Sequence, residues 1–477
     1  MEKEYKNFNL TNLPGNIDAM KSYFERRNAT CIVDVSEENI YKFSFTDTFK
    51  SKEISVNVYF NLQELDNPSL KIKIDNDESI NKYDIEDYSN HLLAQIYTKL
   101  IEGPNKYVVR VYARFYSEHA QELEFTFDWK NKITVTPVIF QERSGIFNAD
   151  TITSSPHEQI LVFDIEVFAI DVTSARTLAY NQAKEVFSFL AVLFDLGIDE
   201  YQSEQIYVLA DVENGENNYT FHSTAMNKGF HDAELDLFVF DNLNGLVAIN
   251  DQNEMVLNSY LTTTYFHDDS SEQTVVLSKD IPELNEKFKN LVLKRKSNRF
   301  VNNPSLNKEI TYYNTKITML TSYITFFRKL KAFKENNKDN FERFSNACKL
   351  YNKALFVCAN EPTMMTAYLI SSLEALLKME INMDYLKEKS SDMHRFLAFV
   401  EKYTDEGGCD VEYFRYLYGT IRSGHFHSGD FKFLEYNVLL NQALSNDFIK
   451  ARNEHIKARK LIRAIFINWI EKNILNR

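Results

Sequence analysis

The segment TMMTAYLISSLEALLKM, Thr363–Met379, decides how the C-terminal third of the chain folds. It is long enough for several turns of α-helix, and Pro362 stands directly before it. Proline suits the first turn of a helix because the amide it lacks has no partner there. Glu374 is the acidic residue of this otherwise apolar helix. If buried it needs a partner, which Arg422 would supply; a carboxylate that faces solvent is the alternative.

Helical spacing of apolar residues continues on both sides of this segment. The other predicted helices of this region are Ile281–Leu293, Ile310–Phe333, Phe341–Ala359, Asp392–Tyr403, Val411–Gly424 and Ile456–Leu475. In the last of them, apolar residues from Ala458 to Trp469 recur at the i, i+3, i+4 and i+7 positions of a packed helix. We therefore expect an all-α bundle here.

The N-terminal half has a different pattern, in which β-branched and aromatic residues alternate with polar ones. The predicted strands are Cys31–Val35, Tyr41–Phe45, Ile54–Leu62, Tyr107–Ser117, Glu122–Trp129, Ile133–Phe140, Leu161–Ile170 and Gln205–Ala210. Helical periodicity occurs at Ser79–Leu100 and at Thr173–Leu196, where Gly197 occupies the position of a left-handed C-terminal residue. The sequence therefore predicts sheets with embedded helices.

These patterns predict an α+β multidomain protein, with a β-rich N-terminal half followed by an all-α C-terminal bundle. We expect a β-rich domain with an embedded helix over residues 1–155, an α+β subdomain over 156–290 and the helical domain over 291–477. The sequence is compatible with either one or two domains in the N-terminal half.

Charge is distributed unevenly along the chain. Residues 1–290 carry 24 Lys+Arg and 48 Asp+Glu, a balance of −24, whereas residues 291–477 carry 30 and 20, a balance of +10; the two give the net charge of −14. A positive C-terminal part fits a domain that binds phosphates, although solvated surface alone gives the same totals.

A short stretch within the predicted bundle carries the candidate chemistry. Tyr418–Gly429 reads YGTIRSGHFHSG and places His427 five residues after Arg422. An arginine followed after four residues by a histidine resembles the signature of HEPN domains, and the surrounding sequence resembles the ApeA-like branch more closely. The helix that contains Ser372–Leu377 (SLEALL) and the final amphipathic helix also resemble that branch, so the resemblance covers roughly residues 340–477.

Two positions depart from the family pattern. Ser423 follows the arginine where Asn, Asp or His is usual, and Ser428 separates His427 from the glycine that usually follows it directly. The N-terminal half resembles the ApeA-like architecture only as a β-rich region that precedes the bundle.

The resemblance implies a metal-independent endoribonuclease of the bacterial anti-phage or toxin kind, acting in abortive infection, with Arg422 and His427 as the catalytic pair. It also implies a homodimer through the helical domain, RNA (with tRNA as one candidate) as substrate, and a phage or cellular trigger bound by the N-terminal half. Supporting residues would be Tyr418, Ser423, His425 and Glu374. Candidate RNA contacts, or else a solvated helix face, are Lys450, Arg452, Lys457 and Arg459.

These residue types suit RNA cleavage because the 2′-hydroxyl of RNA can attack the adjacent phosphate without a metal. A histidine, with an unperturbed pKa of about 6.5, serves as base or acid near neutrality, and an arginine binds two phosphate oxygens. Residues five apart on a regular α-helix point about 140° apart. Either the helix ends near Gly424, or the site is shared between two chains.

Plainer explanations exist for the same residues. Arg422 would then be an ion-pairing arginine and His427 a histidine that complements a helix dipole, in a non-catalytic dimerisation or partner-binding module. His425 and His427 lack the carboxylate or cysteine cluster that zinc requires, so no metal is expected. No GxxxxGKS/T or GxGxxG motif indicates a nucleotide, so no cofactor is expected either.

Cellular location follows from segments that the sequence lacks. The N-terminus has no apolar core of a secretory signal, and no apolar stretch reaches the roughly 18 residues of a membrane span. The cysteines are too scattered to indicate disulfides or a zinc site: Cys31, Cys348, Cys358 and Cys409. We therefore expect a cytoplasmic protein.

Overall fold

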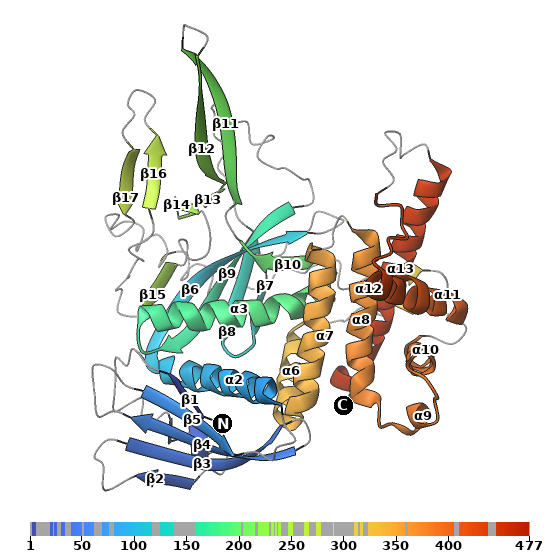
Figure 1. Ribbon diagram of the computed structural model, residues 1–477, viewed down its shortest axis with the longest axis horizontal. Helices are drawn as coiled ribbons and strands as arrows, with labels where there is room; N and C mark the ends of the chain where they lie inside the picture. The colour runs from blue at the N-terminus through green and yellow to red at the C-terminus, as the bar shows by residue number, and fades with distance from the viewer. Residues whose placement is uncertain are drawn as a thin grey trace. The chain divides into compact units, whose positions relative to one another are not determined.

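The computed structural model is an α+β structure in which sheets with helices α2 (Lys82–Ile101) and α3 (Val172–Phe194) among their strands precede a run of C-terminal helices (Figure 1). Contacts divide the chain into two compact units, one of Met1–Tyr107, Val167–Leu178 and Asn250–Glu254, the other of Val108–Glu166, Ala179–Ile249 and Met255–Arg477. The predicted domain limits remain a prediction. The structure describes residues 2–5, 20–21, 23–25, 30–33, 40–49, 52–61, 69–75, 81–116, 125–137, 158–201, 204–214, 218–228, 230–232, 234–235, 237–239, 247–250, 262–266, 273–277, 290, 310–312, 315–317, 323–357, 361–404, 410–436 and 445–476.

The first unit contains a five-stranded antiparallel sheet in the order β1-β5-β4-β3-β2. Its strands are β1 (Glu2–Tyr5), β2 (Thr30–Val33), β3 (Ile40–Phe49), β4 (Lys52–Asn61) and β5 (Ser69–Asp75). Alternate residues such as Val56 and Val58 are buried, the two-residue period of a sheet with one covered face. Helix α2 (Lys82–Ile101) buries Leu92 and Ile96 in the same core. The predicted sheet and embedded helix are confirmed.

The second unit contains most of a six-stranded sheet in the order β10-β6-β9-β8-β7, with β15 paired to β6. Its strands are β6 (Glu102–Tyr116), β7 (Phe125–Asp128), β8 (Lys132–Pro137), β9 (Glu158–Ala169), β10 (Gly197–Glu200) and β15 (Val247–Asn250). Helix α3 (Val172–Phe194) follows β9, and its Phe187 packs on Phe163 with ring centroids 4.9 Å apart. The remaining strands form two-stranded pairs: β11 (Glu204–Asn214) with β12 (Asn218–Lys228), β13 (Phe230–Asp232) with β14 (Leu237–Val239), β16 (Thr262–Phe266) with β17 (Gln273–Leu277), and β18 (Ile310–Tyr312) with β19 (Thr315–Ile317).

The predicted helix Ile310–Phe333 is wrong over its first part. The chain forms the β18–β19 pair there, and helix α6 begins only at Tyr323. Threonine, tyrosine and isoleucine dominate this stretch, and such residues favour extended backbone. Of the predicted helix Ile281–Leu293, all but Asn290 lies outside the described residues.

The end of α3 also differs from the prediction. Asp195, not Gly197, takes the left-handed conformation, with a φ of 55°. Gly197 is required for another reason, because a Cβ added there would lie 2.6 Å from the backbone nitrogen of Phe356. Its neighbour Ile198 exchanges two backbone hydrogen bonds, of 2.8 and 2.6 Å, with the side-chain amide of Asn352. The first strand residues after α3 are thus held against a helix of the bundle.

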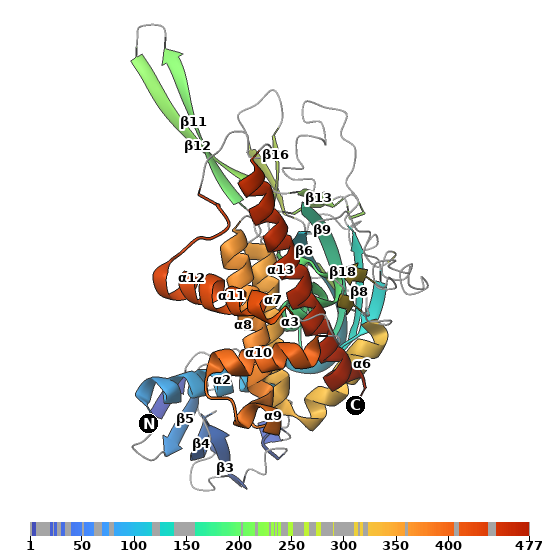
Figure 2. The same ribbon diagram turned by 90° about the vertical axis from the view of Figure 1, so that its right-hand side faces the viewer.

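The C-terminal helices extend from Tyr323 to Leu475 (Figure 2). They are α6 (Tyr323–Asn336), α7 (Lys338–Val357), α8 (Pro362–Glu380), α9 (Asp384–Lys387), α10 (Asp392–Tyr403), α11 (Val411–Tyr416), a π-helical segment (Leu417–Arg422), α12 (Ser423–Ser428), α13 (Asn446–Ile470) and a π-helical turn (Glu471–Leu475). The predicted helix Thr363–Met379 is confirmed as α8, with Pro362 in its first turn. The last helix starts at Asn446, earlier than its apolar stripe suggested.

Aromatic side chains form one core from the second sheet into the helices. Phe127 of β7 stacks on Phe327 of α6 at 4.3 Å, and Phe189 of α3 stacks on Phe344 of α7 at 6.1 Å. Phe344 in turn stacks on Trp469 of α13 at 5.7 Å. Because these rings are packed together, the helices and this sheet form one cooperative structure.

A buried carboxylate joins four of the helices. Glu380 at the end of α8 accepts hydrogen bonds from Tyr385 of α9, from Tyr403 and Lys402 of α10, and from Trp469 of α13. Burial tends to raise the pKa of Glu380, but the bonds from Lys402, Tyr385 and Tyr403 outweigh it, so that the pKa lies below its usual value. The ionised carboxylate fixes how these helices pack.

Candidate active site

The motif YGTIRSGHFHSG lies in one helical run that crosses α8 (Figure 2). Asp410 caps its start by accepting the Tyr413 amide at 3.0 Å. Gly429 ends it with a φ of 69°, and its amide donates to the His425 carbonyl. Only glycine adopts this backbone without strain. The helix therefore continues to Ser428 instead of ending near Gly424, as the prediction Val411–Gly424 had it.

Arg422 is held by a carboxylate on the neighbouring helix. Its Nε and Nη2 lie 3.0 and 2.9 Å from Oε2 of Glu374, and the Tyr418 hydroxyl donates to Oε1 at 3.0 Å. The guanidinium carbon also lies 5.5 Å from the ring centre of Tyr418 and 5.6 Å from that of Phe426. Of the two alternatives for Glu374, the structure has the paired one. The orientation of the guanidinium is thereby fixed.

One edge of this guanidinium is open. The Arg422 side chain is 25% exposed, and its Nη1 makes no hydrogen bond to the described part of the chain. Burial, together with the charge of Glu374 and the bond to it, raises the pKa of Tyr418 to about 12, so its hydroxyl remains a donor at neutral pH. The arrangement can therefore present a positioned N–H donor to an anion.

The histidines of the motif differ in their surroundings. His427 is exposed and makes no hydrogen bond or ion pair with the described residues. His425 is half-buried, with Nδ1 3.3 Å from the Asp430 carbonyl oxygen, and Ser423 is also half-buried. Arg422 and His427 share no hydrogen bond, and their five-residue spacing along a helix directs them about 140° apart. Within the described residues of one chain, no contact joins the two side chains.

A set of hydrogen bonds around Glu435 and Thr363, here called the clamp, was not predicted from the sequence. Glu435 accepts the amides of Thr363 and Phe433 at 2.6 and 3.1 Å, and Thr363 Oγ1 accepts the Lys432 amide at 2.9 Å. A carboxylate is favourable there because the first amides of α8 point outward without helical partners. The clamp fixes the loop after α12 to the start of α8. No local pattern could have revealed it, because Glu435 is remote from Thr363 in the sequence.

His455 on α13 is a second feature that sequence reasoning missed. Its Nδ1 lies 3.2 Å from Thr366 Oγ1, and its ring packs on Phe433 at 5.6 Å. Burial, aided by the positive charge of Arg459, lowers the pKa of His455 to about 4. His455 is thus neutral at physiological pH and belongs to the packing between α8 and α13.

The four predicted RNA contacts on α13 fall into three environments. Lys450 and Arg452 are exposed. Lys457 lies over the Tyr413 ring, 3.9 Å from its centre, and its side chain is 18% exposed. Arg459 is buried and donates to Oδ2 of Asp195 at 3.1 Å. A guanidinium engaged in this way is not available to RNA, and we leave Arg459 out of the candidate surface.

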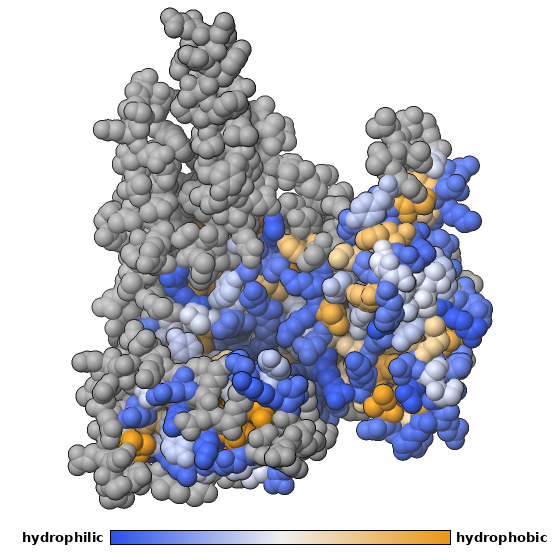
Figure 3. Space-filling model, in the orientation of Figure 1, coloured by the Kyte–Doolittle hydropathy of each residue, from blue (hydrophilic) through white to orange (hydrophobic). Residues whose placement is uncertain are grey.

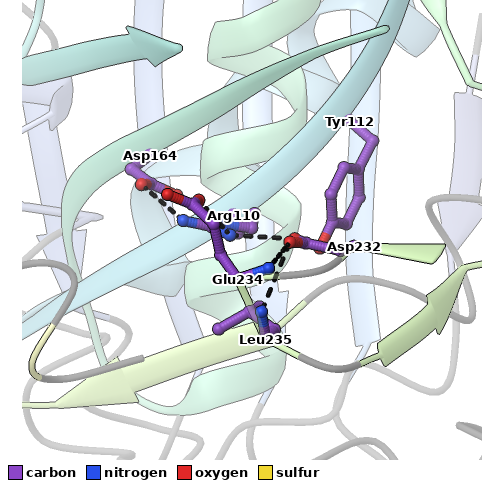
Figure 4. Close-up of polar contacts among 6 residues, drawn as sticks. All are labelled: Arg110, Tyr112, Asp164, Asp232, Glu234 and Leu235. Atoms are coloured by element: carbon purple, nitrogen blue, oxygen red, sulfur yellow. Dashed lines mark hydrogen bonds and ion pairs between the residues drawn. The ribbon is translucent and has the colours of Figure 1, made fainter. Parts of the chain in front are cut away.

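A second charged cluster lies in the sheet of the same unit (Figure 4). Arg110 of β6 is fully buried and contacts both oxygens of Asp164, at 2.9 and 3.0 Å, and Asp232 at 2.9 Å. Tyr112 donates to Asp232 at 2.7 Å, and Glu234 lies 3.5 Å from Arg110. Because burial is nearly complete, we assign this cluster to stability.

Among the described residues, no group of three or more His, Cys, Asp or Glu is arranged to hold a metal ion. No helix in the described ranges combines the length and apolar character of a membrane span. Comparisons with protein-family models, with curated proteins and with solved structures found no match for this chain. Its function is therefore argued from the site itself.

Proposed function

We propose that this protein is a metal-independent endoribonuclease whose helical domain is a dimeric HEPN domain of the ApeA-like branch. One observation carries the proposal. The same helix holds Arg422 in a fixed orientation with an open N–H edge and presents the exposed imidazole of His427. An imidazole can move protons and a guanidinium can stabilise the developing charge when a neighbouring 2′-hydroxyl cleaves a phosphodiester.

In the proposed reaction the 2′-oxygen attacks phosphorus while its proton passes to a base. The bond from phosphorus to the 5′-oxygen breaks, and that oxygen takes up a proton. His427 moves protons, and Arg422 stabilises the charge on the non-bridging oxygens. The products are a 2′,3′-cyclic phosphate and a 5′-hydroxyl end.

The proposal requires two chains, because Arg422 and His427 diverge within one. Two motif helices that meet across a two-fold axis would bring the arginine of one chain to the histidine of the other. This requirement makes oligomeric state a direct check. A protein that cleaves RNA as a strict monomer contradicts the shared site.

The decisive experiment is RNA cleavage in EDTA by the purified chain and its variants. Arg422→Ala and His427→Ala should each lower the rate roughly 10²- to 10⁴-fold. Arg415→Ala, in the same helical run, and His91→Ala, an exposed histidine on α2, are matched controls that should cleave like the wild type. Cleavage that persists in both motif variants overturns the site, and cleavage that needs added metal overturns the mechanism.

A non-catalytic HEPN-fold module that dimerises or binds a partner is the second candidate. The Arg422–Glu374 pair favours it, because the carboxylate offsets the charge that a phosphate would meet. The two candidates give opposite results in one experiment. A dimer that cuts no RNA at any concentration tested fits the second, and loss of cutting on mutation of His427 fits the first.

A role in antiviral defence by abortive infection is part of the same proposal and rests on the resemblance alone. The cytoplasm is the proposed compartment, as expected from the sequence patterns. The acidic N-terminal half would bind a phage or cellular trigger. Sequencing of RNA ends from cells that express the protein or the His427→Ala variant would test the role and identify the target, tRNA included.

A further inference from the structure

Five aromatic rings form a continuous strip beside Arg422. The ring centroids of Tyr368 and Phe426 lie 5.8 Å apart, those of Phe426 and His425 5.4 Å, those of His425 and Phe431 5.3 Å, and those of Phe431 and Tyr436 4.7 Å. All four contacts are edge-to-face. In this geometry the edge of one ring meets the face of the next, so neighbouring rings do not cover each other's faces completely.

Three rings of this aromatic strip are exposed to solvent. Phe426 is 45% exposed, Phe431 41% and Tyr436 65%. Over the helices at the right of Figure 3, pale and orange residues interrupt the hydrophilic surface. Burying such rings would be favourable, so their exposure beside a candidate site points to a ligand.

The exposure is not the result of a loose loop. The Glu435–Thr363 clamp ties the segment that carries Phe431 and Tyr436 to α8, and Phe433 between them is buried. Lys432 and Asp430 add an ion pair at 3.0 Å. The rings are thus held in position before any ligand arrives, which lowers the entropic cost of binding.

Positive groups accompany the rings. Arg422 lies over the face of Phe426, and the Lys432 side chain, next in sequence to Phe431, is 37% exposed. Proteins that bind single-stranded nucleic acid combine such cations, which follow the backbone, with aromatic faces on which bases stack. In an RNA duplex the bases are already stacked and paired, so their faces cannot reach these rings.

We propose that the aromatic strip stacks unpaired bases of the RNA next to the scissile phosphate, so that the enzyme selects single-stranded segments and loops over duplex. The proposal rests on the proposed ribonuclease function. A second copy of this chain is the competing occupant of the strip. The observations favour RNA because cations lie among the rings and because the exposed faces suit flat bases.

The test measures binding of a 2′-O-methyl oligonucleotide, which cannot be cleaved, as a single strand and as a blunt-ended duplex of two complementary strands without a loop. Phe431→Leu and Tyr436→Leu keep an apolar side chain and remove the ring. Each should weaken single-strand binding on the order of tenfold and leave duplex binding unchanged. Phe431→Trp, which keeps an aromatic ring, should bind the single strand about as tightly as the wild type. Tyr83→Leu, an exposed tyrosine on α2, is the matched control and should bind like the wild type.

Three results would overturn the inference: single-strand binding that the leucine variants do not alter, an equal loss for the duplex, or conversion of a dimer to a monomer. The last result assigns the strip to a second copy of the chain. Because the oligonucleotide is not cleaved, binding is read independently of catalysis. If the wild type prefers single strands through these rings and yet cuts no RNA in EDTA, the proposed function fails and the binding preference stands.

Discussion

Two arginines of this protein, each paired with a carboxylate that also accepts a hydrogen bond from a tyrosine, have different surroundings. Arg110 is 0% exposed and meets Asp164, Asp232 and Glu234. The Arg422 side chain is 25% exposed, its carboxylate partner among the described residues is Glu374, and its Nη1 makes no hydrogen bond to those residues. Removing a buried arginine that is surrounded by acids leaves their charges uncompensated and destabilises the fold, whereas an oriented arginine that is partly exposed can bind a ligand. Exposure and the number of partners separate the two roles.

The largest expected effect is the loss of catalysis on removal of the open arginine. Arg422→Ala should reduce RNA cleavage roughly 10²- to 10⁴-fold. The free energy of unfolding should fall by about 1–3 kcal/mol, less than on removal of Arg110, since Glu374 keeps the Tyr418 donor and some access to water. Cleavage rates and urea unfolding of the same preparation separate the two effects. A variant that unfolds in proportion to its lost activity would place Arg422 in the same class as Arg110.

Removal of the buried Arg110 should mainly lower the stability of the fold. Arg110→Met leaves Asp164 and Asp232 buried without that cation and should lower the free energy of unfolding by about 3–5 kcal/mol. Adding Asp164→Leu should recover part of the loss, because one buried charge is then removed. If Arg110→Met alone is as stable as the wild type, the structural role of Arg110 is contradicted.

Stability should also depend on pH through His455. This histidine is neutral in the folded protein because burial lowers its pKa to about 4. In the unfolded chain its pKa is about 6.5. The unfolded state therefore binds more protons between these values, and stability present above pH 6.5 falls as the pH drops toward 4.

Through this histidine, the free energy of unfolding should be about 2 kcal/mol lower at pH 5 than at pH 8. His455→Gln removes the titration and should flatten the dependence of the unfolding free energy on pH by that amount, measured by urea denaturation at both values. A dependence on pH that His455→Gln leaves unchanged would contradict the packing described for His455.

The parts that the sequence predicted well depend on local pattern. The helix α8 follows from a long apolar run preceded by proline, and the alternating strands of the first unit follow from a two-residue period. Glu374 was identified because a lone acid in an apolar helix needs a partner. In each case the residues that determine the outcome lie close together in the sequence or share one simple constraint.

The parts that it missed depend on distant contacts. Arg459 looked like one of several basic residues on α13, because nothing near it in sequence shows that Asp195 lies against it. Gly197 looked like a helix terminator, whereas the backbone of Phe356 is what excludes a side chain there. The β18–β19 pair was taken for helix because the few apolar residues of so short a stretch fit either period.

The tyrosines beside the two arginines provide the finest test of the comparison. Tyr112 donates to the buried Asp232 at 2.7 Å, and Tyr418 donates to the partly exposed Glu374 at 3.0 Å. Tyr112→Phe should lower the free energy of unfolding by about 1.5–3 kcal/mol, because no water replaces the lost donor. Tyr418→Phe should lower it by only about 0.5–1.5 kcal/mol, because water can replace the hydroxyl at a carboxylate that is 17% exposed.

Tyr418→Phe should also slow RNA cleavage several-fold, since one of the contacts that hold Glu374, and through it Arg422, is lost. The ring remains on Phe396, at 4.7 Å, so packing is kept and the hydroxyl alone is tested. Paired urea titrations of the two phenylalanine variants measure the difference directly. If both substitutions cost the same, Glu374 is as closed to water as Asp232, and Arg422 loses the solvent access that distinguishes it from Arg110.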